Sequence, residues 1–532
     1  MLYNPYPSTR LTTYGTKGMV ATSQPLAAQA GLDILKKGGN AVDAAIATAA
    51  CLTVVEPTSN GIGGDAFALV WMKDHLYGLN ASGPAPQSIS INAVKEKGYK
   101  SMPTHGFIPV TVPGAPAAWA ELSDKFGKLD FKELLAPAIA HAEEGYALTP
   151  ILAKYWEKAY NQYKEKLTDE LFSNWFETFA PNGRAPKVGE IWSSSDHAKT
   201  LRELAETKSE SLYNGHLADQ IDSYSRKHGG FLRKQDLQRY KSKWVEPISV
   251  NYRGYDVWEA PPNGQGLVAL MGLNMTKRFQ FESTLNMEDY HRQIEALKLA
   301  YSDGHKHIAE KGNMKYSVDD LLSDNYGEKR ANQIGDEAVL PKASEPSSGG
   351  TVYLATGDAE GNMVSFIQSN YEGFGSGLVV PGTGIALQNR GHNFSMNPKH
   401  VNALEGGKRS FHTIIPGFLT KDSKPVGPFG VMGGFMQPQG HMQVVSHLID
   451  CQLNPQMVLD APRWQWTKEK EVLIEPDFPN HIAQGLERKG HHIRVELDTG
   501  RFGRGQIILR NNETGVLAGG TESRTDGTIA VW

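Results

Sequence analysis

The first clear pattern in the chain is a pair of helices near its start. Between residues 26 and 37, apolar side chains recur every three or four positions, and Gly38-Gly39 ends the run. Asn40 has the side chain of an N-cap, which predicts a second helix over 41–54. Because this second segment is rich in alanine, it can pack closely against a sheet.

The pattern then alternates between strands and helices. A glycine-rich loop at 60–65 leads into an apolar strand at 66–71. From about 114 to 335 helical periodicity dominates, interrupted by one predicted hairpin, 248–251 with 256–259. The clearest helices of this region are predicted at 117–126, 131–144, 196–208 and 290–300.

A surface linker of prolines, serines and glycines at 336–350 separates this helical region from the rest. After it, short strands at 352–356 and 363–368 flank a turn and predict a hairpin. Helices are predicted over 438–450 and 482–489. Two helical layers enclosing antiparallel strands predict an α+β fold, a four-layer α/β/β/α sandwich rather than a parallel βαβ sheet.

Composition narrows the classes of function. A chain of 532 residues predicts one large layered domain or two domains. With 21% charged residues and a net charge of −4, the chain lacks the basic balance of a nucleic-acid-binding protein. No apolar run reaches the roughly 18 residues of a membrane span, and no signal peptide is visible. We therefore expect a cytoplasmic protein without nucleic-acid or membrane partners.

Neither the cysteines nor the histidines predict a metal site. Cys51 and Cys451 lie in apolar helical patterns, which favours buried thiols over a disulfide or a metal cluster. His305 and His307 follow a helical pattern without a third ligand nearby, and His491-His492 is interpreted as a polar turn before a strand. We expect no metal and no cofactor.

The most informative residue is Thr351, at the head of a predicted strand and directly after Gly349-Gly350. A threonine in this position can attack the Gly350 carbonyl, and hydrolysis of the resulting ester leaves Thr351 with a free α-amine. That amine has a reference pKa of about 8, so it can accept the proton of its own hydroxyl. On local sequence alone, an ordinary strand after a glycine turn is the favoured explanation of Gly350-Thr351, and features elsewhere in the chain reverse that preference.

Segments along nearly the whole chain resemble the γ-glutamyltranspeptidase family, and they occur in the family's order. They are Gly18–Ala21, Gly38–Ala45, Glu56-Pro57 with Gly61–Gly64, Val112–Gly114, Leu135–Ala138, Gly349–Thr351, Phe374–Gly377, Gly407–Arg409 and Gly433-Gly434. Single glycine motifs are weak signals, but a collinear set is specific. The resemblance implies the four-layer sandwich of N-terminal nucleophile hydrolases.

The resemblance also implies a precursor that is cut between Gly350 and Thr351. The larger fragment, 1–350, and the smaller one, 351–532, would remain associated and interleaved in one domain. Thr351 would be the nucleophile of both self-cleavage and turnover, and Gly433-Gly434 would supply the backbone donors of the oxyanion hole. Ser369, 18 positions after Thr351, falls where the family has a hydroxyl bonded to the nucleophile. Whether the protein forms a homodimer or a higher oligomer stays open.

The substrate-binding residues depart from the family pattern. Ser82 stands where γ-glutamyl-binding relatives have an arginine for the α-carboxylate, and Asn393 replaces the acidic residue that binds the α-amine. His412-Thr413 replaces a pair of serines, and Tyr371 replaces an asparagine. Arg390 lies close to Asn393 in the sequence and adds a positive charge to this corner.

These departures lead to a hypothesis about the substrate. Removing a carboxylate and adding a cation disfavours an ammonium group, so Arg390, with His392, is expected to hold an acyl group that ends in a carboxylate. Glutaryl groups fit this description, and relatives of the family include cephalosporin acylases. The ordinary alternative for Arg390 is a surface ion pair. The segment between Met396 and Gly407 is too short for a lid, which favours hydrolysis over transfer.

The leading interpretation is a self-processing amidohydrolase that cleaves γ-glutamyl or glutaryl-type small-molecule amides, as a glutathione hydrolase or a cephalosporin acylase does. The alternative is a catalytically impaired family member that binds a ligand or serves as a scaffold. Thr351, Ser369 and Gly433-Gly434 favour the enzyme.

Overall fold

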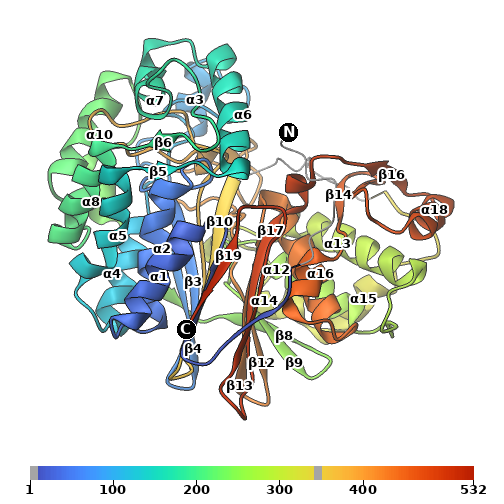
Figure 1. Cartoon of the computed structure of the whole chain (residues 1–532). Coiled ribbons are helices and arrows are strands. Elements are labelled where there is room, and N and C mark those ends of the chain that lie inside the picture. The colour runs from blue at the N-terminus through green and yellow to red at the C-terminus, as the bar shows by residue number, and fades with distance from the viewer. Residues whose placement is uncertain (1–9, 341–349) are drawn as a thin grey trace.

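Two seven-stranded sheets stacked face to face form the centre of the molecule in the computed structural model, which describes residues 10–340 and 350–532 (Figure 1). The sheet that contains Thr351 has the strand order β19-β2-β10-β11-β3-β4-β7. Its strands are β2 (Gly18–Thr22), β3 (Asp65–Met72), β4 (His75–Ala81), β7 (Lys243–Val245), β10 (Gly350–Asp358), β11 (Met363–Tyr371) and β19 (Thr528–Val531). Their pairings are antiparallel throughout, as the sequence predicts.

The second sheet has the order β1-β18-β17-β13-β12-β9-β8. Its strands are β1 (Thr13–Gly15), β8 (Ile248–Tyr252), β9 (Tyr255–Glu259), β12 (Gly417–Lys421), β13 (Lys424–Met432), β17 (Arg504–Arg510) and β18 (Leu517–Thr521). The hairpin predicted at 248–259 is therefore one edge of this sheet. Two smaller sheets pair β5 (Tyr146–Ala147) with β6 (Ile191–Trp192), and β14 (Trp464–Lys468), β15 (Glu471–Ile474) and β16 (His492–Val495).

Helices cover the outer face of each sheet (Figure 1). On the side of the Thr351 sheet lie α1 (Pro25–Lys36), α2 (Ala41–Val55), α3 (Ile91–Glu96), α4 (Ala115–Phe126), α5 (Phe131–Glu144), α6 (Pro150–Lys166), α7 (Ser173–Phe179), α8 (Ser195–Thr207), α9 (Glu210–Tyr213), α10 (His216–Lys227) and α11 (Lys234–Arg239). On the other side lie α12 (Gly266–Thr276), α13 (Met287–His307), α14 (Val318–Leu322), α15 (Asp324–Ala331), α16 (Gln437–Ile449), α17 (Pro455–Asp460) and α18 (Asn480–Arg488).

The three largest apolar clusters among the described residues fill the spaces between these layers. One lies between the two sheets and contains Phe67 and Tyr353 from the first and Phe418 and Ile508 from the second. Each of the other two lies between one sheet and its helices. The predicted α/β/β/α sandwich is thereby confirmed, because apolar side chains point from both faces of each sheet.

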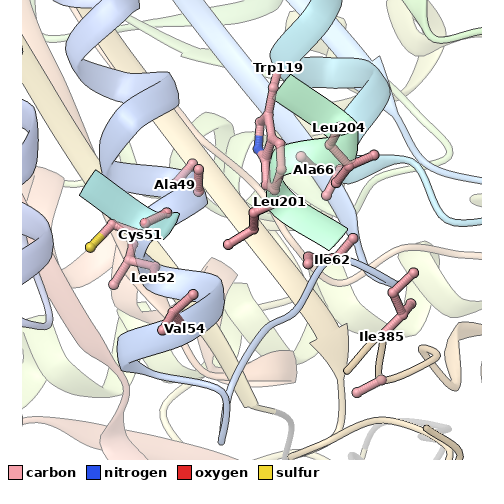
Figure 2. Packing of buried hydrophobic residues seen from close by; sticks show 14 of the residues in the cluster. Ala49, Cys51, Leu52, Val54, Ile62, Ala66, Trp119, Leu201, Leu204 and Ile385 are labelled. Atoms are coloured by element: carbon pink, nitrogen blue, oxygen red, sulfur yellow. The ribbon is translucent and has the colours of Figure 1, made fainter. Parts of the chain in front are cut away.

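The helix that packs against the Thr351 sheet forms as its sequence indicates. Asn40 caps α2 through a capping box with Asp43: the Asn40 side chain accepts from the Asp43 amide at 3.0 Å, and the Asp43 carboxylate accepts from the Asn40 amide at 3.0 Å. Every residue of α2 is buried. Figure 2 shows one side of this core, where Trp119 of α4 lies among Ala66, Leu201 and Leu204.

Some expectations change in the structure or lie outside it. The predicted helix at 290–300 is the centre of the longer α13. Cys51 is buried in α2, but Cys451 follows the end of α16 and is only half-buried, so the expectation of a buried helical thiol is wrong there. Gly349 and most of the predicted linker (341–349) lie outside the described residues, as does the start of the chain. Within the described ranges, no helix has the length and apolarity required to cross a membrane.

Candidate active site

Thr351 is the second residue of β10 and is buried, with 1% of its surface exposed. Gly350 pairs with Tyr371 and Val352 pairs with Gln368, so an irregularity in the ladder leaves Thr351 without a regular partner. Its hydroxyl donates to Ser369 Oγ at 3.2 Å. The two hydroxyl residues that the sequence predicts are therefore in contact.

Ser369 also contacts the bond that is predicted to break. Its hydroxyl donates to the Gly350 carbonyl oxygen at 2.8 Å and accepts from the Tyr371 amide at 2.7 Å. A donor on this carbonyl stabilises the negative charge that develops on the oxygen when a nucleophile attacks the carbon. Ser369 is thus placed to assist attack by Thr351 on Gly350.

The close packing around residue 350 explains why this position requires glycine. A Cβ at this position would lie 2.9 Å from the Gly373 amide nitrogen and 3.3 Å from the Thr58 carbonyl oxygen. Both neighbours are backbone atoms, which move only with their strands and loops.

A Gly350→Val variant is therefore expected to mature slowly. The branched side chain shifts the scissile carbonyl away from the Ser369 hydroxyl, and small displacements at a reacting centre reduce rates by about 10²-fold. Intact mass after timed incubation measures the conversion. Gly312, whose surroundings are open, provides the control, and equal conversion of Gly350→Val and Gly312→Val would contradict the assignment.

Gly433 and Gly434 follow the end of β13, where the chain turns into α16. Their φ values are +135° and +60°, a region that residues with a side chain rarely adopt. Gly433 and Gly350 line the same cavity, whose volume is about 470 Å³. The cavity therefore joins the predicted cleavage site to the loop that is predicted to donate to the oxyanion.

Arg390 is buried beside Ser369, so the alternative of a surface ion pair is wrong. Its guanidinium donates to Thr413 Oγ1 at 2.7 Å and to Ser369 Oγ at 3.5 Å, and it lies 4.4 Å from the centre of the Tyr371 ring. Among the described residues, its Nε has no hydrogen-bond partner. Burial lowers the pKa of Arg390 to about 10, and the nearby Asp65 charge opposes that change.

Tyr371 and Asn393 complete this group. The Tyr371 hydroxyl donates to Asn393 Oδ1 at 2.7 Å, and the Asn393 amide donates to the Phe411 carbonyl at 3.1 Å. Tyr371 has a φ of +80°, which is strained for a bulky residue and is typical of functional sites. Its backbone turns at the same point where its amide binds Ser369.

The other predicted binding residues have separate partners. His392 contacts the Met102 carbonyl through Nδ1 at 2.8 Å, so the structure does not join it to Arg390. The Ser82 hydroxyl donates to Asn80 Oδ1 at 2.7 Å. His412 contacts Asp65 at 3.0 Å through Nε2.

Sequence reasoning missed several polar residues around this group, namely Asp65, Asn263, Gln265 and Gln388. Gln265 is buried and donates to the carbonyls of Thr413, at 2.6 Å, and Gly434, at 2.9 Å. It therefore ties the Arg390 side of the site to the glycine loop. A lone acidic residue at the head of an apolar strand was the available signal for Asp65.

One cluster of ligand-type side chains occurs in the described ranges, formed by His291, Glu295 and His491, whose ligand atoms lie within 4.8 Å of one another. His491 is buried, so the expected polar turn is wrong at this residue. The Lys298 ammonium lies 2.6 Å from Glu295 and donates to the Val339 carbonyl at 2.6 Å. Because Lys298 already supplies the positive charge, we interpret the cluster as structural.

Comparison with known proteins identifies the family of this chain. The sequence profile of the family described as Gamma-glutamyltranspeptidase matches residues 27–532. The chain belongs to this family. A crystal structure titled as cephalosporin acylase from Bacillus halodurans is 63% identical, with a TM-score of 0.97, and the match covers 100% of this chain and 98% of that one.

Two curated relatives are also similar over nearly their full lengths. The glutathione hydrolase-like YwrD proenzyme of Bacillus subtilis (strain 168) is 35% identical, covering 96% of this chain and 98% of the relative. The oxamate amidohydrolase proenzyme of Klebsiella pneumoniae is 32% identical, covering 97% and 98%. The predicted family and fold are confirmed. This member of the γ-glutamyltranspeptidase family is an N-terminal nucleophile hydrolase, a self-processing amidohydrolase, and the impaired-scaffold alternative is not favoured.

Proposed function

We propose that this enzyme cleaves itself before Thr351 and then hydrolyses small-molecule amides whose acyl group ends in a carboxylate, glutaryl amides above all. The observation that carries the substrate class is the buried Arg390 guanidinium beside Ser369 and Thr413, with a free Nε. The cephalosporin acylase and glutathione hydrolase-like names of its relatives support hydrolysis of small-molecule amides.

Self-cleavage begins with attack of Thr351 Oγ1 on the Gly350 carbonyl carbon. The Thr351 hydroxyl proton can pass through Ser369 Oγ, which contacts both the hydroxyl and the Gly350 carbonyl oxygen. The C–N bond breaks, the leaving nitrogen takes the proton, and an ester joins Gly350 to Thr351. Water hydrolyses the ester and leaves a carboxylate on Gly350 and a free amine on Thr351.

Turnover repeats this chemistry on a substrate amide. The Thr351 amine accepts the hydroxyl proton, Oγ1 attacks the substrate carbonyl, and the amine product leaves with that proton. Water then hydrolyses the acyl ester. Gly433 and Gly434 are assigned to the oxyanion because they follow β13, and Gly433 lines the cavity that Gly350 also lines.

The enzyme is expected to distinguish acyl groups by the charged groups at the end remote from the scissile amide. Asn393 offers an amide where γ-glutamyl enzymes have an acid, so the substrate ammonium loses its ionic partner. A guanidinium instead binds a carboxylate through charge-assisted hydrogen bonds, which contribute about 1.5–3 kcal/mol each. We therefore place the terminal carboxylate of the acyl group at Arg390, with Thr413 and Tyr371 around it.

An Arg390→Gln variant is expected to raise KM for glutaryl-p-nitroanilide about 10- to 100-fold, as one charge-assisted bond is lost. Valeryl-p-nitroanilide, which carries a methyl group in place of the terminal carboxylate, serves as the matched substrate and is expected to change little in KM. Wild-type enzyme is expected to prefer glutaryl- over γ-glutamyl-p-nitroanilide. A clear preference for the γ-glutamyl compound would overturn the assignment.

Four further expectations from the sequence remain proposals. The boundaries of the two fragments, 1–350 and 351–532, are tested by intact mass of the matured protein. Hydrolysis rather than transfer is tested by product analysis with an added amine. We also propose a cytoplasmic location and a homodimer or higher assembly.

A further inference from the structure

Asp65 is a buried acid that the chemistry above does not use. It is the first residue of β3 and is fully buried. In the antiparallel pairing of β3 with β11, Asp65 lies directly opposite Ser369. A carboxylate therefore lies on the strand next to the residue that contacts both Thr351 and the scissile carbonyl.

Three donors converge on the Asp65 carboxylate. Oδ1 accepts from the Gly83 amide at 3.0 Å and from Gln388 Nε2 at 2.8 Å. Oδ2 contacts His412 Nε2 at 3.0 Å. The Ile414 amide donates to His412 Nδ1 at 3.3 Å, and burial keeps the pKa of His412 well below its usual range, so the neutral ring carries its proton on Nε2. All three partners donate, which suits an ionised carboxylate.

Arg390 supplies the strongest compensating charge for the Asp65 carboxylate. Burial raises the pKa of Asp65 to about 7, and the Arg390 charge is the strongest influence that opposes the rise. The adjacent residues His412 and Thr413 join the two groups, because His412 binds Asp65 and Thr413 accepts from Arg390. A buried guanidinium without a nearby anion would be strongly destabilised and would move toward water.

We propose that Asp65 is a positioning residue for self-cleavage: its carboxylate, fixed by His412, Gln388 and Gly83, holds the Arg390 guanidinium against Ser369 and Thr413. This inference rests on the proposed roles of Thr351 and Ser369. Arg390 keeps the Ser369 hydroxyl directed at the Gly350 carbonyl oxygen, where charge develops as Thr351 Oγ1 attacks. Asp65 itself takes no proton from Thr351 and forms no bond in the step.

The test measures self-cleavage of freshly made precursor by pulse–chase in a cell-free translation. Asp65→Asn is expected to slow conversion about 10- to 100-fold, less than the loss of a direct oxyanion donor. If Asp65 acts through Arg390, the Asp65→Asn/Arg390→Gln double variant cleaves no more slowly than Arg390→Gln alone. In a Thr351→Ala background every chain stays intact, so melting temperatures can be compared. There the double variant is expected to melt at a higher temperature than Asp65→Asn, because it no longer has a buried Arg390 guanidinium without its compensating anion.

The pH profile of self-cleavage distinguishes a positioning role from a purely structural one, because a purely structural role of Asp65 would leave the profile unchanged. In the precursor the Thr351 amine is part of a peptide bond, so it does not titrate. The wild-type rate of self-cleavage is expected to rise as the pH passes through about 7, where Asp65 loses its proton. This rise is expected to be absent in Asp65→Asn. The charged or titratable groups that face Asp65 are His412, Arg390, Arg409, Tyr213 and Tyr240.

A His412→Phe variant keeps the test decisive if Asp65→Asn fails to fold. The ring packs against Phe67, so an aromatic replacement preserves the contact while removing the hydrogen bond to Asp65. Loss of a donor favours the protonated acid, so the midpoint of the rise with pH is expected to move above 7. Asp450→Asn is the matched control, because Asp450 is also buried against an arginine, Arg253, and its loss should leave the profile unchanged.

The inference is overturned if Asp65→Asn cleaves at the wild-type rate, or if the effects of Asp65→Asn and Arg390→Gln multiply as for independent sites. An unmoved midpoint in His412→Phe overturns it as well. Failure of the proposed function looks different: the Thr351→Ala precursor would then still split. A wild-type chain that splits, a Thr351→Ala chain that does not, and an Asp65→Asn chain that splits normally would sink this inference alone.

Discussion

A Thr351→Ala variant is expected to remain a single chain of 58.4 kDa and to lose amide hydrolysis. Alanine has no oxygen to attack Gly350, so neither the ester nor the free amine can form. Loss of a nucleophile in comparable enzymes reduces kcat by about 10⁶-fold, and we expect a loss of at least about 10⁴-fold here. Denaturing electrophoresis and p-nitroanilide release measure the two effects.

The same strand offers a matched control for this variant. Thr356 is also a buried threonine of β10, but its hydroxyl donates to the Ala41 carbonyl, away from the site. Thr356→Ala is expected to mature and to turn over substrate, at some loss of stability. Splitting of the Thr351→Ala chain at the 350/351 bond would refute the assignment of the nucleophile.

Replacing Ser369 with alanine is expected to slow self-cleavage by about 10²- to 10³-fold, the usual effect of losing one oxyanion donor. The variant removes the hydroxyl that donates to the Gly350 carbonyl and accepts from Thr351. A Ser369→Thr variant restores the donor and is expected to recover most of the rate. The first-order conversion of precursor, followed by intact mass, gives the comparison.

Ser365 provides the control for Ser369. It lies on the same strand, β11, is fully buried, and its hydroxyl contacts the Tyr353 hydroxyl at 2.8 Å. Ser365→Ala therefore removes a buried serine hydroxyl of the same sheet without touching the scissile bond. Equal slowing in Ser365→Ala and Ser369→Ala would mean that Ser369 acts through stability and not on the carbonyl.

Local signals in the sequence were sufficient for much of the fold. The Asn40 cap and the glycines at 38–39 determine where α1 ends and α2 begins, because capping and left-handed backbone depend on neighbouring residues only. The β10–β11 hairpin follows from apolar runs around a turn. Pairings such as that of β10 with β2, more than 300 positions apart in the chain, were not predicted and are given only by the tertiary structure.

The site divides in the same way. Thr351, Ser369 and the glycine pair could be located by their spacing and by family resemblance, and the structure brings Thr351 and Ser369 into contact. The burial of Arg390 and its link to Asp65 could not be predicted from the sequence, because the exposure of a side chain depends on which other segments cover it. His392 was predicted to act with Arg390 because the two are close in the sequence. In the structure its ring instead contacts the Met102 carbonyl.

From residue types in a fixed local order and their resemblance to a family, the sequence predicted the type of layered fold, which is confirmed, and the nucleophile and fragment boundary, which stay predictions. Tertiary structure alone decided which charges face one another: Asp65, Arg390 and His412–Thr413 are brought together from three distant segments. The physical reason is that charge interactions and desolvation depend on distance and burial in space, which no spacing along the chain records.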